Sequence, residues 1–248
     1  MKQFVVTSSM GKRLIARGVV KHPAVAAAMK KGRLAIVAGT TNGYVAEEVL
    51  SALGQTDGFT RAGFRRGTTT PPGFTAPQTP PTSDVVIVDG VWMKGKEIFD
   101  VVDDMQHGDV ILKGGNSLDV CRGQATALIA HPMGGSLAAS IPAVIGRRVK
   151  MIVPIGLEKR VPGDLATLCA LCNAPDAEGP RMMSLPGETF TELDAIALLT
   201  GAKATLLAAG GIHGAEGSCW IGIQGDPEAV HAGESLIHSI SREPPCQA

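Results

Sequence analysis

Four short runs of mostly apolar residues, each followed by glycine or polar residues, constrain the fold of this chain most strongly. The run at 110–112 is the clearest example, because it leads directly into Lys113, two glycines and small polar residues. Short apolar runs bounded by turn residues are typical of strands that are buried on both faces of a parallel sheet. Helical patterns separate the four runs, which occupy residues 34–38, 85–88, 110–112 and 150–155.

This alternation predicts an α/β protein with an open, mostly parallel sheet and helices on both faces. We expect a core domain over residues 1–161, in which the pattern at 118–130 predicts a helix. Residues 162–186 contain four prolines and little periodicity, so they are expected to form a linker. Residues 187–248 show the pattern helix, strand, strand, helix, which predicts a small C-terminal α+β domain.

The composition excludes several classes of protein. Lys plus Arg and Asp plus Glu number 23 each, so the net charge favours neither nucleic acid nor an anionic membrane as a partner. No apolar run approaches the roughly 18 residues of a membrane span, and the apolar start is too short for a signal peptide. These features predict a cytoplasmic protein.

Five cysteines, an odd number in a chain of this length, do not suggest a disulfide framework. Cys169 and Cys172 have the spacing of half a zinc site or of a redox pair. They fall late in a predicted helix, where the helix dipole disfavours thiolates, and no second ligand pair is present. We therefore expect both cysteines to be packed in the protein interior.

Ligands of open α/β sheets bind beyond the carboxyl ends of the strands. A turn rich in glycine and hydroxyl groups after the first strand offers backbone N–H groups to an anion, although an ordinary helix N-cap is the alternative. If the four strand ends share one edge, they form a pocket for negative charge. The candidate residues at these ends are Gly39, Thr40, Thr41, Asn42 and Gly43, then Asp89 and Gly90, then Lys113, Gly114, Gly115, Asn116 and Ser117, and finally Lys159.

These motifs resemble the superfamily of ribose-phosphate isomerases, glucosamine-phosphate deaminases and CoA-transferases, and most of all its ribose-phosphate isomerase branch. Residues 39–43 are similar to the phosphate loop of that branch, and residues 111–116 to its Leu-Ile-Lys-Gly-Gly-Gly strand end. Residues 89–92 resemble its Asp-Gly-Ala-Asp turn, and residues 151–159 its strand followed by a Ser-Lys pair. The resemblance extends from about residue 30 to residue 160.

The resemblance implies a homo-oligomer without cofactor or metal that binds, and acts on, a phosphorylated or otherwise anionic small metabolite by isomerase-like proton transfer. Lys113 would stabilise the developing negative charge and Asp89 would orient it. The family's catalytic glutamate falls on Arg122 here, which has the wrong charge for a base. Asp119 or His131 would therefore have to move the proton.

Two other functions remain open. Loss of the base while the phosphate loop persists is what a non-catalytic sensing module for sugar phosphates would show. Acyl or CoA transfer uses a glutamate nucleophile in this superfamily, for which Glu188 and Glu216 are candidates. In a glycine-rich loop, His213 and Glu216 could relay a proton, but two ligands are too few for a metal site.

The proline-rich stretch 54–83 predicts a long ordered loop, and long loops in compact domains are often lids or binding loops. Arg61, Arg65 and Arg66 at its near end could reach an acidic ligand. Solvated surface charge is the alternative interpretation of these arginines.

Overall fold

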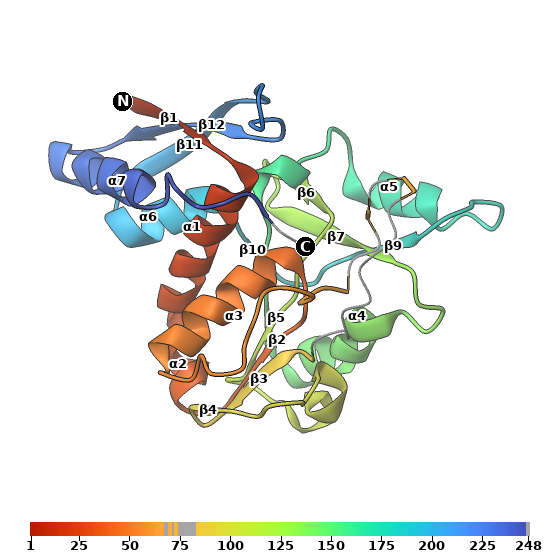
Figure 1. Cartoon of the computed structure of the whole chain (residues 1–248). Helices are drawn as coiled ribbons and strands as arrows, with labels where there is room; N and C mark the ends of the chain where they lie inside the picture. The colour runs from red at the N-terminus through yellow and green to blue at the C-terminus, as the bar shows by residue number, and fades with distance from the viewer. Residues whose placement is uncertain (67–68, 71, 74–82, 247–248) are drawn as a thin grey trace.

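The computed structural model describes residues 1–66, 69–70, 72–73 and 83–246, and these residues form seven α-helices and three β-sheets (Figure 1). The predicted α/β class is confirmed. The proline-rich centre of the predicted loop, residues 74–82, lies outside the described residues. No helix in the described part of the chain is long and apolar enough to span a bilayer.

The largest sheet has six strands in the order β10-β8-β5-β2-β3-β4. The first four run parallel, whereas β3 and β4 are antiparallel to their neighbours, so the sheet is mixed. The predicted strands 34–38, 85–88, 110–112 and 150–155 are all present in it. The strands are β10 (Glu188–Phe190), β8 (Lys150–Pro154), β5 (Val110–Leu112), β2 (Arg33–Ile36), β3 (Val85–Val88) and β4 (Val91–Trp92).

The direction of β3 follows from the path of the preceding segment. Gln55 lies at the amino end of β2, where its side chain binds Gly90 and Trp92 of the β3–β4 turn. Arg66, eleven residues later, lies at the carboxyl end of β2, where it binds Asp84. Because the chain has already crossed the length of the sheet before β3 begins, β3 runs back antiparallel to β2.

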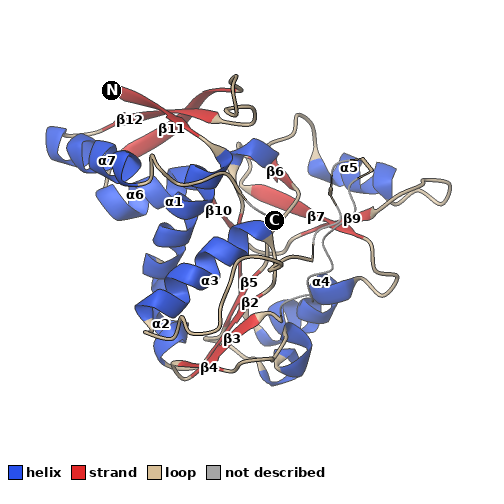
Figure 2. Ribbon diagram, viewed as in Figure 1, coloured by secondary structure: helices blue, strands red, loops and turns tan. Residues whose placement is uncertain are grey.

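Helices α1 (Ser8–Lys21), α2 (Pro23–Lys30) and α3 (Thr40–Ala52) gather beside β2, β3 and β5, and α4 (Gly135–Ile141) lies on the other side of these strands in the view of Figure 2. Pro23 separates α1 from α2, since proline occupies the first turn of α2. The Thr7 hydroxyl caps α1 by accepting from the N–H of Met10. Short 3₁₀ turns cover Ile98–Asp100, Val102–Asp104 and Leu157–Lys159, and a π-helical turn covers Pro142–Gly146.

A second sheet, β6-β7-β9, replaces the helix predicted over residues 118–130, so that prediction is wrong. The Asp119 carboxylate accepts from the N–H groups of Cys121 and Arg122, and Gly123 has a φ of 61°, which together turn the chain into a hairpin. The segment predicted as a linker, 162–186, instead contains a helix and the strand β9. The elements are β6 (Ser117–Asp119), β7 (Gln124–Ile129), α5 (Leu165–Cys172) and β9 (Arg181–Ser184).

The C-terminal elements follow the predicted order helix, strand, strand, helix. The N-terminal strand β1 also joins them, because it pairs with β12 in the sheet β1-β12-β11. β10, in contrast, belongs to the six-stranded sheet, so the C-terminal region is interleaved with the rest of the chain. The elements are β1 (Lys2–Val6), α6 (Glu192–Thr200), β11 (Lys203–Ala209), β12 (Cys219–Gln224) and α7 (Pro227–Ser239).

Candidate functional site

Three of the four predicted strand ends meet at one edge of the six-stranded sheet. The N–H of Val37 donates to the carbonyl of Leu112 at 3.0 Å, and the N–H of Lys113 donates to Ile152 at 3.1 Å. The Asn42 side chain donates to the carbonyls of Val37 (2.8 Å) and Leu112 (3.0 Å), which fastens the start of α3 to both strands. The turn 39–43 and Lys113 therefore share the carboxyl edge, as predicted.

Asp89 and Gly90 are at the opposite edge, so their predicted place in this pocket is wrong. β3 is antiparallel to β2, with Val88 opposite Arg33, and the carboxyl end of β3 therefore lies at the amino end of β2. The exposed Asp89 accepts from the N–H of Gly32 at 2.8 Å, and Gly90 has a φ of 82° in the tight β3–β4 turn. Both residues serve the turn.

The acid that the carboxyl edge does contain is Asp84, whose side chain is fully buried at the start of β3. Its carboxylate accepts from the N–H groups of Ala38 (2.8 Å) and Ile98 (2.9 Å) and from the guanidinium of Arg66 (3.1 and 3.2 Å). Sequence reasoning missed this residue, because it precedes its strand instead of following it. An acid directly before an apolar run is a signal only once the direction of the strand is known.

Lys113 lines a pocket of about 750 Å³ together with Arg66 and His131. Among the described residues the ammonium has no hydrogen-bond or ion-pair partner. Burial lowers the pKa of Lys113 to about 8; the charge of Asp84 opposes this effect, and the charges of Arg66 and Lys159 add to it. The pocket is mainly apolar: Phe99, Leu128, Ile129, Ala130, Met133, Leu137, Ala138 and Ala139 line it, with Gly134, Gly135 and Ser136.

Lys159 supports the turn that follows Lys113. Its ammonium donates to the carbonyl of Gly115 at 2.8 Å, and burial lowers its pKa. Gly114 faces open space, since a Cβ added there would meet no heavy atom within 4 Å. A Cβ on Gly115 would lie 3.0 Å from Ile155 Cδ1 and from the carbonyl of Thr126, so Gly115 is required for packing.

Asn116 and Ser117 were predicted to bind the ligand, but the structure places them in the start of the β6–β7 hairpin. The N–H of Asn116 donates to Thr126 at 2.7 Å, and the Asn116 side chain accepts from the N–H of Leu128 at 3.0 Å. Ser117 is buried in β6, opposite Thr126. Both residues fix the hairpin that forms one wall beside the pocket.

The start of α3 leaves donors free for an anion. The N-cap residue is Gly39, which has no side chain. No side-chain cap therefore accepts a hydrogen bond from the first N–H groups of this helix. The buried hydroxyl of Thr41 and the buried amide oxygen of Asn42 have no hydrogen-bond partner among the described residues. Thr40 is exposed. A Cβ added to Gly43 would lie 3.6 Å from the side chains of Arg61 and Phe64, so Gly43 is packed against them.

Only one of the two predicted bases reaches the Lys113 pocket. His131 lines it, and its Nδ1 accepts from the N–H of Met133 at 3.1 Å, so the neutral ring carries its proton on Nε2. Asp119 lines a separate pocket of about 740 Å³ with Glu158 and Arg160. The N–H of Arg122 is the main cause of the lowered pKa of Asp119, which keeps this carboxylate ionised and engaged in the hairpin turn.

A second group of ionisable side chains, not predicted from the sequence, lies beside that other pocket. The buried Glu192 accepts from the N–H of Leu157 at 3.0 Å, and burial and the charge of Glu158 raise its pKa. Lys12 is buried and donates to Glu158 and to the carbonyl of Ser8, both at 3.2 Å. These residues join α1, α6 and the end of β8.

The remaining predicted side chains lie outside the Lys113 pocket. Glu188 pairs with Lys150 at 2.7 Å and with His22 at 3.3 Å, and Glu216 accepts from Gly214 at 2.9 Å in an exposed loop. Cys169 and Cys172, expected in the interior, are only partly buried on α5.

Within the described part of the chain, no group of three or more His, Cys, Asp or Glu side chains is arranged to hold a metal ion. The resemblance to the isomerase superfamily remains an expectation from motifs. Comparison with family models, with curated proteins and with solved structures finds no match for this chain.

Proposed function

We propose that the pocket beside Lys113 binds an anionic small metabolite and that the protein transfers a proton on it. One observation carries the proposal: a half-buried ammonium lines a mainly apolar pocket and has no partner among the described residues. A charge in such surroundings is costly unless it is paired. A bound anion would supply the missing counter-charge, and Arg66, the second cation of the pocket, would share it.

The roles of the side chains follow from their contacts. Lys113, with its pKa near 8, is partly neutral close to neutral pH, so it can accept a proton as well as stabilise an anion. His131 presents Nε2–H as a donor to a developing oxyanion, since its Nδ1 is engaged by Met133. Asp84 orients Arg66 and has no free lone pair directed at a ligand, because four donors already surround it.

The start of α3 is a second place at this sheet edge where a phosphate group would be stabilised, but none of residues 39–43 lines the Lys113 pocket. Free N–H groups at a helix N-terminus bind phosphate well, and the helix dipole adds to the attraction. A phosphate group there and a reacting carbon near Lys113 would use the same sheet edge.

A non-catalytic sensing module uses the same pocket and differs only in the absence of turnover. Acyl or CoA transfer is less well supported, since Glu188 and Glu216 both lie away from Lys113. Exchange of a ligand C–H for deuterium in heavy water separates the first two functions, because only a catalyst moves the proton.

Binding is tested by calorimetric titration of ribose 5-phosphate, inorganic phosphate and 4-methyl-2-oxopentanoate into the wild type and into Lys113→Met and Arg66→Met. We expect each variant to weaken binding of the best ligand by about tenfold to a hundredfold, as for loss of one charged contact. Lys31→Met removes an exposed lysine and is the matched control, with unchanged affinity. Equal affinities in all four proteins would refute the proposal.

A further inference from the structure

The lining of the Lys113 pocket selects among anionic ligands. Among the described residues that form it, only Arg66, Lys113, His131 and Ser136 have polar side chains. A sugar phosphate brings several hydroxyl groups, each of which loses free energy if it is buried without a partner. A carboxylate on an apolar carbon skeleton needs only a cation and apolar walls, and the pocket offers both.

We propose that Lys113 forms an imine with the carbonyl carbon of a 2-oxo carboxylate that carries an apolar side chain, while Arg66 holds the carboxylate. This inference rests on the proposed function, because it uses the same pocket and the same cations. Asp84 binds Nε and one Nη of Arg66, and Glu97 pairs with that same Nη at 3.1 Å. The other Nη has no partner among the described residues, and a third of the side chain is exposed, so Arg66 is held in place with one Nη left for the ligand. The apolar wall of Leu128, Ile129 and Leu137 accommodates the side chain of the ligand.

The environment of Lys113 is what an imine-forming lysine requires. The nucleophile is the neutral amine, and a lysine loses its proton readily when it is desolvated and lies near other cations. Lys113 meets both conditions, with apolar lining around it and the charges of Arg66 and Lys159 nearby. No carboxylate of the described residues pairs with its ammonium, so nothing in that part of the chain restrains the side chain from reaching a carbonyl carbon.

The chemical step balances without any added oxidant or reductant. The amine lone pair forms the C–N bond, the π pair of the C=O bond moves to oxygen, and transfer of one proton from nitrogen to oxygen gives a carbinolamine. A second proton, taken from water, which becomes hydroxide, lets the oxygen leave as water, and a protonated imine remains. The positive imine nitrogen then acidifies the neighbouring C–H, which links the imine to the proposed proton transfer.

Lys159 provides an internal comparison. It lies at the same edge, is also half-buried and also has a lowered pKa. Its ammonium, however, donates to the carbonyl of Gly115 at 2.8 Å and does not line the Lys113 pocket. A lysine that supports a turn should not react, even though burial favours its neutral form.

The test is reductive trapping of the full chain with 4-methyl-2-oxopentanoate and cyanoborohydride, followed by peptide mass spectrometry. We expect a single adduct on Lys113, at least about tenfold above the adduct on Lys159 or on any exposed lysine, and a rate that rises with a midpoint near pH 8. Lys113→Arg keeps the cation but removes the nucleophile, so it should fold, melt near the wild-type temperature and form no adduct. Absence of an adduct, or adducts spread evenly over the exposed lysines, would overturn the inference.

A second ligand separates this inference from the proposed function. 2-Hydroxy-4-methylpentanoate has the same carboxylate and side chain but no carbonyl, so it can bind and cannot form an imine. If it binds in a manner that depends on Arg66 while the 2-oxo acid is not trapped, the imine is wrong and anion binding stands. If neither acid binds, the imine is wrong, because no 2-oxo acid reaches Lys113. The titrations with phosphate and ribose 5-phosphate then decide whether the proposed anion binding is correct.

Discussion

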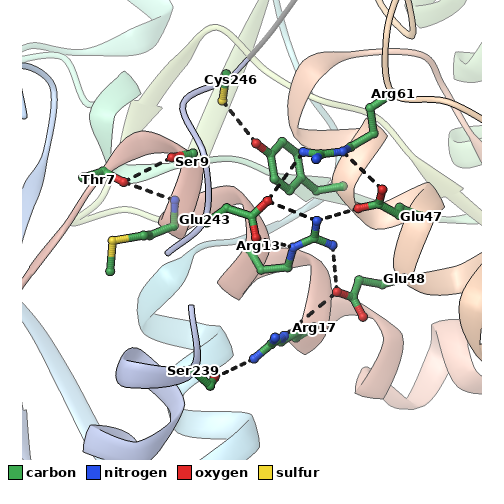
Figure 3. Close-up of polar contacts among 12 residues, drawn as sticks. Thr7, Ser9, Arg13, Arg17, Glu47, Glu48, Arg61, Ser239, Glu243 and Cys246 are labelled. Atoms are coloured by element: carbon green, nitrogen blue, oxygen red, sulfur yellow. Dashed lines mark hydrogen bonds and ion pairs between the residues drawn. The ribbon is translucent and has the colours of Figure 1, made fainter. Parts of the chain in front are cut away.

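Two cations of this protein, Arg13 and Lys113, have opposite surroundings. The Arg13 side chain is only 11% exposed and binds Glu47, Glu48 at 2.8 Å and Glu243 at 2.9 Å (Figure 3). Burial opposes its charge, but the hydrogen bonds to Glu243, Glu47 and Glu48 outweigh burial and raise the pKa of Arg13. Lys113 has no such partner among the described residues, and burial lowers its pKa to about 8.

The difference separates a structural charge from one that is available for function. Arg13 joins α1, α3 and the C-terminal segment, and Arg61 also binds Glu47 (Figure 3). The guanidinium carbon of Arg61 lies 3.9 Å from the ring centre of Tyr44. Each charge there is neutralised within the fold. Near Lys113, in contrast, Asp84 and Glu97 both pair with Arg66, and within the described part of the chain neither carboxylate pairs with the Lys113 ammonium, so an external anion would stabilise that charge.

The largest expected effect comes from removing the structural cation. Arg13→Met leaves three glutamates close together without their shared partner, and we expect a loss of roughly 2–4 kcal/mol in the free energy of unfolding. Urea denaturation measures it. Arg17→Met is the matched control, because Arg17 is 35% exposed and lies 3.9 Å from Glu48, and it should cost less than about 1 kcal/mol. Similar losses in the two variants would contradict a special role for Arg13.

Removing the Lys113 cation should act in the opposite direction. The unfolded chain holds the lysine proton up to about pH 10.4, whereas folded Lys113 releases it near pH 8, so the wild type gains stability as the pH rises between these values. Lys113→Met should therefore be more stable than the wild type by about 1–3 kcal/mol at neutral pH.

Denaturant titrations at several pH values test this prediction. The advantage of Lys113→Met should shrink as the pH approaches that of the unfolded lysine. A variant that is less stable than the wild type at neutral pH would show that the ammonium is paired within the fold.

The smallest effects should distinguish the packed turn from the open pocket. Gly115→Ala brings a Cβ to 3.0 Å from Ile155 and from the carbonyl of Thr126, and should cost about 1–2 kcal/mol. Gly114→Ala adds a methyl group to open space and should change stability by less than about 0.5 kcal/mol. Thermal melting of the two variants measures the difference, and equal melting temperatures would mean that the turn is not packed as described.

The apolar runs predicted most of the central sheet, because a strand buried on both faces requires them. The strand direction could not be read from the same residues. Val85–Val88 is apolar throughout and would suit either direction; the path from Gln55 to Arg66 decides it. The wrong direction placed Asp89 in the pocket and left Asp84 out.

The hairpin at 117–129 was missed for a related reason. Ala125, Leu128 and Ile129 fit a helical face as well as a strand, and periodicity alone does not separate the two in a short segment. The decisive signal was the turn chemistry of Asp119 and Gly123, which sequence reasoning did not weigh. Lys113 was identified because its position after a buried strand fixes the edge on which it lies.

The central claim is that Lys113 is a poorly compensated ammonium, and its own titration tests this most directly. Lysine residues carrying ¹³C at Cε can be followed by NMR against pH, with Lys113→Arg to assign the resonance. We predict a midpoint near pH 8 for Lys113 in the ligand-free protein and an upward shift when an anion is bound. A midpoint at or above about 10.4, the value of an exposed lysine, would contradict the account.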